Sequence, residues 1–198
     1  MAKIDKDLIQ RLRDITGLGL MDCRKALEDT DGDFEKAIEI LRKKGAAVAT
    51  KRSDKTTAEG MVHAYIHPGS QIGVLLELNC ETDFVARTPD FQQLAHDVCM
   101  HIAAMRPLYL SKEDVDPNFL AREREIFKEQ IADSGKPEKI LSQIIEGKIN
   151  KLCTDICLLN QPFVKNDQFT VAELLQQLMA KTGESIRIKR FARFEVGL

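Results

Sequence analysis

The sequence lacks both a long apolar run and an excess of charge of one sign. No uninterrupted apolar stretch among the 198 residues approaches the ~20 residues that span a bilayer. The formal net charge is −2, with 43% hydrophobic and 30% charged residues. That balance is typical of a soluble globular protein and is poorly suited to neutralising phosphates. We therefore expect neither membrane insertion nor direct nucleic-acid binding.

Motifs for nucleotide, hydrolytic or metal chemistry are also missing. The chain contains no GxxxxGK[ST], HExxH or GxSxG, and no GxGxxG follows a strand. Of the four histidines, His96 and His101 lie five residues apart, a poor spacing for sharing one metal on a helix. Both are expected to be capped or half-exposed polar residues. We predict no catalytic residue, no metal and no cofactor, which leaves little support for an enzyme.

Cysteine usage excludes a further group of sites. The five cysteines form no CxxC pair, which argues against a zinc or thioredoxin-like site. Cys153 and Cys157 are four residues apart, as expected for two buried thiols on one helix face. This usage indicates a reducing, cytoplasmic setting. The first seven residues carry acids and form no apolar segment, so we expect neither a signal nor a transit peptide.

Residues 1–45 predict three short helices in a compact bundle, small enough to leave apolar residues on its surface for a partner. Apolar residues recur at helical spacing in each segment. The first helix is expected to end at Gly17, the second to open after Gly19, and the third to stop at Gly45.

A linker is predicted at residues 46–59. These residues are mostly small and polar, although they could also continue the third helix, whose cap is Asp31 or Asp33. Three basic side chains occur here without interleaved aromatic residues. That pattern favours a solvated tether over a nucleic-acid patch.

Residues 60–198 predict a mixed α+β core domain. Alternation over 61–66 and 72–78, with Pro68-Gly69-Ser70 between them, indicates a β-hairpin. A helix is then expected from Pro89 to about Met105, with Thr88 as its N-cap.

The second half of this domain predicts more helix and a last strand. Residues 117–158 are interpreted as a protruding helical hairpin that is broken at 133–137. A capping box at 170–173 opens a helix that Gly183 closes. Alternation over 186–196 predicts a strand that completes an antiparallel sheet with the hairpin. Its odd positions form the expected wet face, listed as Arg187, Lys189, Arg193 and Glu195.

The strongest functional candidate lies at residues 77–87. An apolar run at 72–76 precedes it, and an acid and a large aromatic, Asp83 and Phe84, stand side by side within it. Since a new helix begins at Pro89, this pair falls at a strand exit, where side chains are displayed rather than held in a ladder. A projecting phenyl ring is typical of an interface anchor. We interpret the pair as a wedge for another protein.

For three apolar residues, the sequence leaves open whether the side chain is exposed for a partner or buried in the core. Phe84 could instead pack beneath the following helix against Phe91 or Leu94. Similarly, Leu20 and Met21 could belong to the bundle core, in which case helical phase makes Met21 the more exposed of the two.

Two long motifs and several short ones together identify a family. The long motifs span residues 12–27 and 77–87 and read LRDITGLGLMDCRKAL and ELNCETDFVAR. Shorter matches follow at 100–104, 134–137, 161–164 and 193–197. The chain thereby resembles, over nearly its whole length, the elongation factor Ts family of guanine-nucleotide exchange factors for elongation factor Tu.

The resemblance implies a set of partner-binding residues. It implies that the N-terminal bundle is ubiquitin-associated-like and docks on the GTPase domain of elongation factor Tu. Arg13, Leu20 and Met21 occupy its contact positions, although the family more often has Met where this chain has Leu20. The partner-binding motif Thr82-Asp83-Phe84-Val85 belongs to the second signature of the family, and its Asp83-Phe84 pair matches the residues inserted beside the partner's magnesium and switch region. His67 matches a hairpin-tip histidine of longer members, although such a residue is usually just solvated.

The resemblance also implies an assembly. Long members of the family have two related core subdomains, each with a hairpin, whereas this chain has one. Its length resembles the short form, in which two chains are thought to pair, so we expect a homodimer and a 2:2 complex.

Two other functions remain open. One is a ubiquitin-associated-like adaptor without exchange activity. The other is an RNA-binding translation accessory that would use the basic residues of the last strand, against which the net charge of −2 argues.

Overall fold

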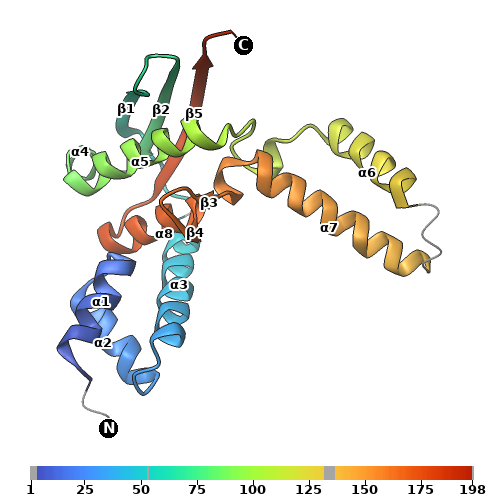
Figure 1. Cartoon of the computed structure of the whole chain (residues 1–198). Coiled ribbons are helices and arrows are strands. Elements are labelled where there is room, and N and C mark those ends of the chain that lie inside the picture. Colours follow the sequence, from blue (N-terminus) through green and yellow to red (C-terminus); the bar gives the residue numbers. More distant parts are fainter. Residues whose placement is uncertain (1–3, 53, 132–136, 198) are drawn as a thin grey trace. The chain divides into compact units, whose positions relative to one another are not determined.

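The structure, a computed structural model, describes residues 4–52, 54–131 and 137–197 (Figure 1). It is α+β, as predicted from the sequence. The chain divides into two compact units, Met1–Met100 with Ala172–Leu198, and His101–Val171. Within the described ranges, no helix is long and apolar enough to cross a membrane.

The first unit begins with the helical bundle. Its helices are α1 (Lys6–Thr16), α2 (Leu20–Asp29) and α3 (Phe34–Lys51). Gly17 ends α1 in the left-handed conformation, at a φ of 66°, and donates its N–H to the carbonyl of Arg13 at 2.7 Å. Of the two acids expected to cap α3, Asp33 accepts the N–H of Lys36 at 3.1 Å.

Helix α3 continues to Lys51. The prediction that it stops at Gly45 is therefore wrong. Gly45 is buried, and a Cβ there would lie 3.6 Å from the carbonyl oxygen of Gln176 on α8 (Val171–Thr182). The glycine therefore allows α3 and α8 to pack closely and does not end α3. The alanines that follow it favour helix, and residues 46–51 continue the third helix, which was the alternative expected for this segment.

A three-stranded antiparallel sheet forms the rest of the first unit. Its strands are β1 (Glu59–Ile66), β2 (Ile72–Cys80) and β5 (Ile186–Glu195), in the order β1-β2-β5. The short helix α4 (Asp83–Ala86) and helix α5 (Pro89–Met105) follow β2, as Figure 1 shows. Thr88 caps α5, as predicted, by accepting the N–H of Phe91 at 3.3 Å.

A β-bulge reverses the predicted faces of the last strand. Glu77 of β2 pairs with Arg190 but Leu78 pairs with Ile188, so Lys189 is an extra residue. Beyond the bulge the odd positions turn inward. Arg193 and Glu195 form an ion pair at 2.7 Å, with side chains only 12% and 18% exposed. The predicted wet face is therefore correct up to Lys189 and wrong after it.

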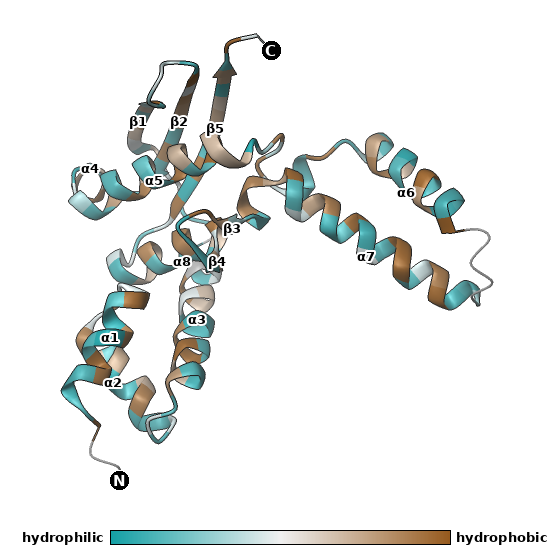
Figure 2. Ribbon diagram, in the orientation of Figure 1, coloured by the Kyte–Doolittle hydropathy of each residue, from teal (hydrophilic) through white to brown (hydrophobic). Residues whose placement is uncertain are grey.

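The second unit contains the predicted helical hairpin. Its helices are α6 (Pro117–Ile131) and α7 (Glu138–Ile156), and Arg124 of α6 bonds Glu146 of α7 at 3.0 Å. Figure 2 shows hydrophobic and hydrophilic residues alternating along α7. Cys153 and Cys157 are both buried, as predicted. Most of the predicted break at 133–137 lies outside the described residues, and the protrusion of the hairpin stays a prediction.

Short elements complete the second unit. They are η1 (Lys112–Asp114), η3 (Leu158–Asn160), β3 (Pro162–Phe163) and β4 (Asn166–Thr170), of which β3 and β4 form a two-stranded sheet. His101 is fully buried, contrary to the prediction of a capped or half-exposed residue. Its Nε2 pairs with Gln161 at 2.9 Å, and its Nδ1 accepts the N–H of Val164 at 3.2 Å. These partners satisfy the ring in the interior.

Candidate partner-binding site

Phe84 is the most exposed large hydrophobic residue of the described chain, at 80%. It lies on the single turn α4, which Thr82 caps by accepting the N–H of Val85 at 3.4 Å. Val85 is buried on the same turn and anchors it. The alternative in which Phe84 packs beneath α5 is wrong, because Phe91 and Leu94 are buried there without it.

Asp83 stands beside the exposed ring and is already paired. Its carboxylate contacts the guanidinium of Arg87 at 2.8 Å, and the Asp83 side chain is 45% exposed. An exposed pair of this kind contributes little to stability. Asp83 can therefore exchange Arg87 for another polar partner without a large energetic penalty.

Two carboxylates hold the turn that carries Phe84. Glu184 accepts both the N–H and the hydroxyl proton of Thr82, at 3.1 and 2.7 Å. Glu81 accepts the N–H of Ser185 at 2.7 Å and contacts the guanidinium of Arg52 at 3.1 Å. Segments about a hundred residues apart in the chain are thereby joined next to the exposed ring.

A buried thiol supports the same turn from below. Cys80 donates its S–H to the carbonyl of Thr82 at 3.0 Å. Burial, and then the charge of Glu184, raises the pKa of the Cys80 thiol to about 11. The group therefore stays protonated and remains a donor near neutral pH.

The bundle presents the residues predicted to dock. Leu20 is 47% exposed and Met21 is 68% exposed at the start of α2, and Arg13 is exposed near the end of α1. The alternative that places Leu20 and Met21 in the bundle core is therefore wrong. The core is formed instead by Leu12, Cys23, Ala26, Leu27 and their neighbours.

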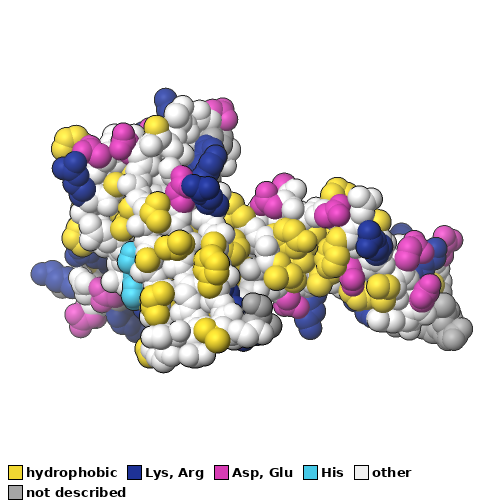
Figure 3. Space-filling view, turned by 90° about the horizontal axis from the view of Figure 1, so that it is seen from above, with side chains coloured by type: hydrophobic (Ala, Val, Ile, Leu, Met, Phe, Trp, Pro, Cys, Tyr) yellow, Lys and Arg dark blue, Asp and Glu magenta, His cyan; other side chains and the backbone are white. Residues whose placement is uncertain are grey.

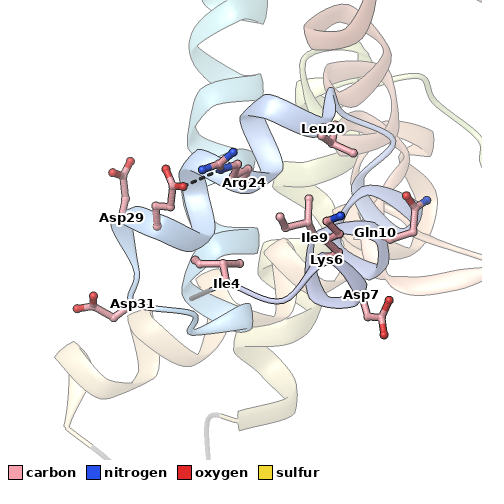
Figure 4. A pocket seen from close by; sticks show the side chains of 10 residues that line it. Ile4, Lys6, Asp7, Ile9, Gln10, Leu20, Arg24, Asp29 and Asp31 are labelled. Carbon is pink, nitrogen blue, oxygen red and sulfur yellow. Dashed lines mark hydrogen bonds and ion pairs between the residues drawn. The ribbon is translucent and has the colours of Figure 1, made fainter. Parts of the chain in front are cut away.

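A hollow that includes Leu20 in its lining lies between α1 and α2. Ile4, Ile9 and Leu20 line it together with charged side chains (Figure 4). Arg24, on its wall, forms an ion pair with Glu28 at 2.7 Å. A lining that combines apolar and charged side chains is suited to an amphipathic protein segment.

His67 lies at the predicted hairpin tip and is exposed. The hydroxyl of Tyr65 is 2.9 Å from its Nδ1, which orients the ring. The three predicted groups, at 13–21, at 67 and at 82–85, lie on separate elements of the first unit.

One face of the three-stranded sheet is apolar and is left uncovered by the described residues of the first unit. On the other face, His96 of α5 stacks edge-on against His63 and Tyr65 of β1. The uncovered face carries five exposed apolar side chains: Val62, Ile66, Leu75, Phe194 and Val196, exposed at 68%, 63%, 47%, 65% and 68%. Figure 3 shows hydrophobic side chains gathering at the molecular surface. We call these five residues the apolar sheet face.

Pairing across the strands makes this face continuous. Ile66 pairs with Gly73, which in turn pairs with Phe194. A Cβ on Gly73 would lie 3.1 Å from the Ile66 side chain, so the glycine leaves room for Ile66 to lie across the strand. An exposed patch of this kind on a folded protein marks an interaction surface.

Sequence reasoning missed both the carboxylate partners of Thr82 and the apolar sheet face. Glu184 follows a helix-ending glycine and has no local pattern that links it to residue 82. The sheet face was hidden by the bulge at Lys189, which moves Phe194 to the outside.

Comparison with known proteins extends these observations. A family model for Elongation factor TS matches residues 21–198 of the chain. The chain is 51% identical to the Elongation factor Ts of Thermotoga petrophila over 195 residues, covering 98% of this chain and 97% of that protein. It is 53% identical to that of Moorella thermoacetica over 189 residues, covering 96% and 93%. It is 52% identical to that of Geotalea uraniireducens over 189 residues, covering 96% and 88%.

Proposed function

Since this chain belongs to the elongation factor Ts family, we propose that it is a guanine-nucleotide exchange factor that promotes GDP release from elongation factor Tu by disturbing the magnesium site. The family itself implies exchange on elongation factor Tu in translation elongation. The single observation that carries the finer proposal is the 80% exposure of Phe84 on a rigidly held turn. We place this activity in the cytoplasm, where elongation takes place.

The proposed mechanism acts on the metal rather than on the nucleotide itself. A GTPase of this kind holds its nucleotide with phosphate-binding backbone amides, a lysine and a magnesium ion that bridges phosphate oxygens. Phe84 would enter a pocket between two helices of the partner and shift the element that carries the magnesium ligands. Asp83 would leave Arg87 and stabilise the shifted arrangement by a polar contact. No covalent bond forms or breaks.

The bundle is proposed to supply the grip. Leu20 and Met21 give it an exposed apolar contact, and Arg13 adds a charge nearby in sequence. Leucine in place of methionine keeps the apolar volume of the contact. Docking here would hold the partner while Phe84 acts at the nucleotide site, and His67 is proposed as a further contact at the hairpin tip.

Linkage sets the energy that the mechanism needs. The exchange factor must bind the nucleotide-free partner more tightly than the GDP-bound one, and GDP must weaken its binding by the same factor. A thousandfold effect requires about 4 kcal/mol of differential binding. Burial of one phenyl ring supplies roughly 1.5–3 kcal/mol of this, and weakened magnesium ligation would supply the rest.

We also propose that two chains pair through the apolar sheet face and form a 2:2 complex with the partner. A self-complementary apolar face is suited to a twofold contact between copies. The described residues contain one three-stranded sheet, whereas the family resemblance implies two core subdomains, each with a hairpin, in long members. Light scattering after gel filtration tests this, because Phe194→Glu should give monomers and the control Ile126→Glu should leave dimers. A wild-type monomer at micromolar concentration would contradict the pairing.

Fluorescent GDP tests the exchange activity. Elongation factor Tu is loaded with the fluorescent nucleotide, and its release is followed in excess GDP with and without the chain. We expect the chain to accelerate release strongly. Binding to elongation factor Tu without acceleration would instead support the adaptor, and RNA binding without acceleration would support the translation accessory.

A further inference from the structure

The turn that presents Phe84 is too short to hold its own shape. Helix α4 has four residues, and a single helical turn is unstable in water without tertiary support. The phenyl ring itself cannot fix the turn, because it is 80% exposed. The orientation of Phe84 therefore depends on what holds the backbone at Thr82 and Val85.

Glu184 is the strongest holder of that backbone. Its two carboxylate oxygens separately accept the N–H and the hydroxyl proton of Thr82, at 3.1 and 2.7 Å. The same hydroxyl oxygen accepts the N–H of Val85, so one side chain links the carboxylate to the turn. Hydrogen bonds to an ionised acceptor are about twice as strong as neutral ones.

The position of Glu184 is itself well defined. It lies between Gly183, which ends α8 with its N–H on the carbonyl of Met179 at 2.8 Å, and the start of β5 at Ile186. Its own N–H donates to Thr182 Oγ at 3.3 Å. Two regular elements thus fix the carboxylate that fixes the turn.

Glu81 completes a reciprocal arrangement and extends it to the bundle. Glu184 accepts hydrogen bonds from Thr82, the residue after Glu81. In turn, Glu81 accepts the N–H of Ser185, the residue after Glu184, at 2.7 Å. Glu81 also accepts from the guanidinium of Arg52, which directly follows α3, at 3.1 and 3.3 Å. A chain of charge-assisted contacts therefore runs from the helix of the bundle to the turn that carries Phe84.

We propose that Glu184 is a positioning residue for nucleotide exchange, which acts through Thr82 to hold Phe84 in its productive orientation. Glu81 and Arg52 tie this clamp to the docking bundle. The exchange part of the proposal rests on the proposed function, whereas the clamping of the turn does not.

The primary variant is Glu184→Gln, which keeps the shape but turns one acceptor into a donor that faces the donors of Thr82. We expect the maximal rate of GDP release from elongation factor Tu to fall about tenfold. The concentration for half-maximal acceleration should stay within about twofold, because Glu184 is not among the proposed docking residues. The control Glu39→Gln neutralises an exposed carboxylate elsewhere, which pairs with Lys43 at 2.7 Å, and should leave both values unchanged.

A double variant separates positioning from a general structural role. If Glu184 acts through Phe84, Glu184→Gln should slow release no further in a Phe84→Ala background. Equal slowing in both backgrounds would overturn the proposal. Should Glu184→Gln fail to fold by circular dichroism, Thr82→Val removes the same hydroxyl contact and takes its place in the cycle.

Amide hydrogen exchange of the free chain supplies a readout that needs no partner. We expect faster exchange at residues 82–88 in Glu184→Gln and unchanged exchange in α1 and α2. Unchanged exchange at 82–88 would overturn the clamp even if release slows. If the wild-type chain does not accelerate GDP release, the proposed function fails, and this measurement still decides whether Glu184 holds the turn.

Discussion

Phe84 and Val85 are neighbours on one helical turn, yet Phe84 is 80% exposed and Val85 only 9%. Successive helical residues point about 100° apart, so a single turn can bury one side chain and display the next. The hydroxyl of Thr82 closes this turn. Display of the ring thus follows from the helical turn, which Glu184 in turn holds through Thr82.

Replacing Phe84 by alanine should separate function from stability. We expect Phe84→Ala to slow GDP release from elongation factor Tu by about ten- to a hundredfold, the value of one buried aromatic anchor. Because the side chain is exposed in the free chain, the free energy of unfolding should change by less than about 0.5 kcal/mol. Stopped-flow fluorescence and urea unfolding measure the two quantities.

The matched control is Val85→Ala on the same turn. Removing buried methyl groups should cost about 1–3 kcal/mol of stability. An unchanged release rate in Phe84→Ala would mean that the exposed ring is not the wedge.

Met21→Ala should weaken docking more than the exchange step itself. Met21 is 68% exposed and lies on the bundle, away from the Thr82 turn in sequence. We expect the concentration for half-maximal acceleration to rise about tenfold, with the maximal rate nearly kept. A titration of the release rate against chain concentration measures this.

Leu27→Ala is the control for the bundle. Leu27 is fully buried in the bundle core, so its truncation should cost about 2–5 kcal/mol. If Met21→Ala lowered only the maximal rate, Met21 would belong to the exchange step rather than to docking.

Much of the local structure could be predicted, because it depends on local signals. Gly17 ends α1, Thr88 caps α5, and the hairpin turn falls between β1 and β2, as the sequence indicated. The sequence left open whether Phe84 is exposed or packs under the next helix, because neighbouring residues alone do not decide this.

The errors came from contacts that are distant in sequence. A glycine such as Gly45 commonly ends a helix, but here it allows α8, more than a hundred residues later in the chain, to pack closely against α3. The bulge at Lys189 depends on pairing with β2. In the sequence, two consecutive basic residues, Lys189 and Arg190, interrupt the alternation of β5 at this point. The Glu184–Thr82 contact joins two loops, and no spacing rule connects them.

Two glycines should respond oppositely to alanine. Gly45 is helical, and a Cβ there would meet Gln176 at an ordinary contact distance of 3.6 Å. Gly45→Ala should therefore raise the free energy of unfolding, by up to about 1 kcal/mol. At Gly60, φ is +146° and a Cβ would lie 2.2 Å from the Leu78 carbonyl oxygen.

Gly60→Ala should accordingly cost more than about 2 kcal/mol. Urea unfolding followed by circular dichroism compares the two variants with the wild type. A loss of stability in Gly45→Ala would contradict this prediction, because it would mean that α3 and α8 leave no room for the added methyl group.

Stability should fall as the pH drops below neutrality. Burial lowers the pKa of His101 from its ordinary value of 6.5, and burial followed by the nearby His96 lowers the pKa of His63. Below about pH 6.5 the unfolded chain therefore binds protons that the folded chain does not. The free energy of unfolding is thus fully retained above that pH and is lost as the pH falls towards the lowered pKa values.

Urea unfolding at pH 7.5, 6.5 and 5.5 measures this dependence. His101 contributes at most about 1.4 kcal/mol per pH unit. A variant with His63→Asn and His101→Asn should show a shallower dependence. An equal slope in the variant and the wild type would assign the effect to other groups.

The central claim is that the chain binds nucleotide-free elongation factor Tu in preference to the GDP-bound form. Titration calorimetry of the chain into elongation factor Tu, with magnesium and with or without saturating GDP, tests it most directly. We expect GDP to weaken binding by about a hundredfold or more, by the same factor as the chain weakens GDP binding. Equal affinity for the two forms would contradict the account, because a protein that does not distinguish them cannot shift the nucleotide equilibrium.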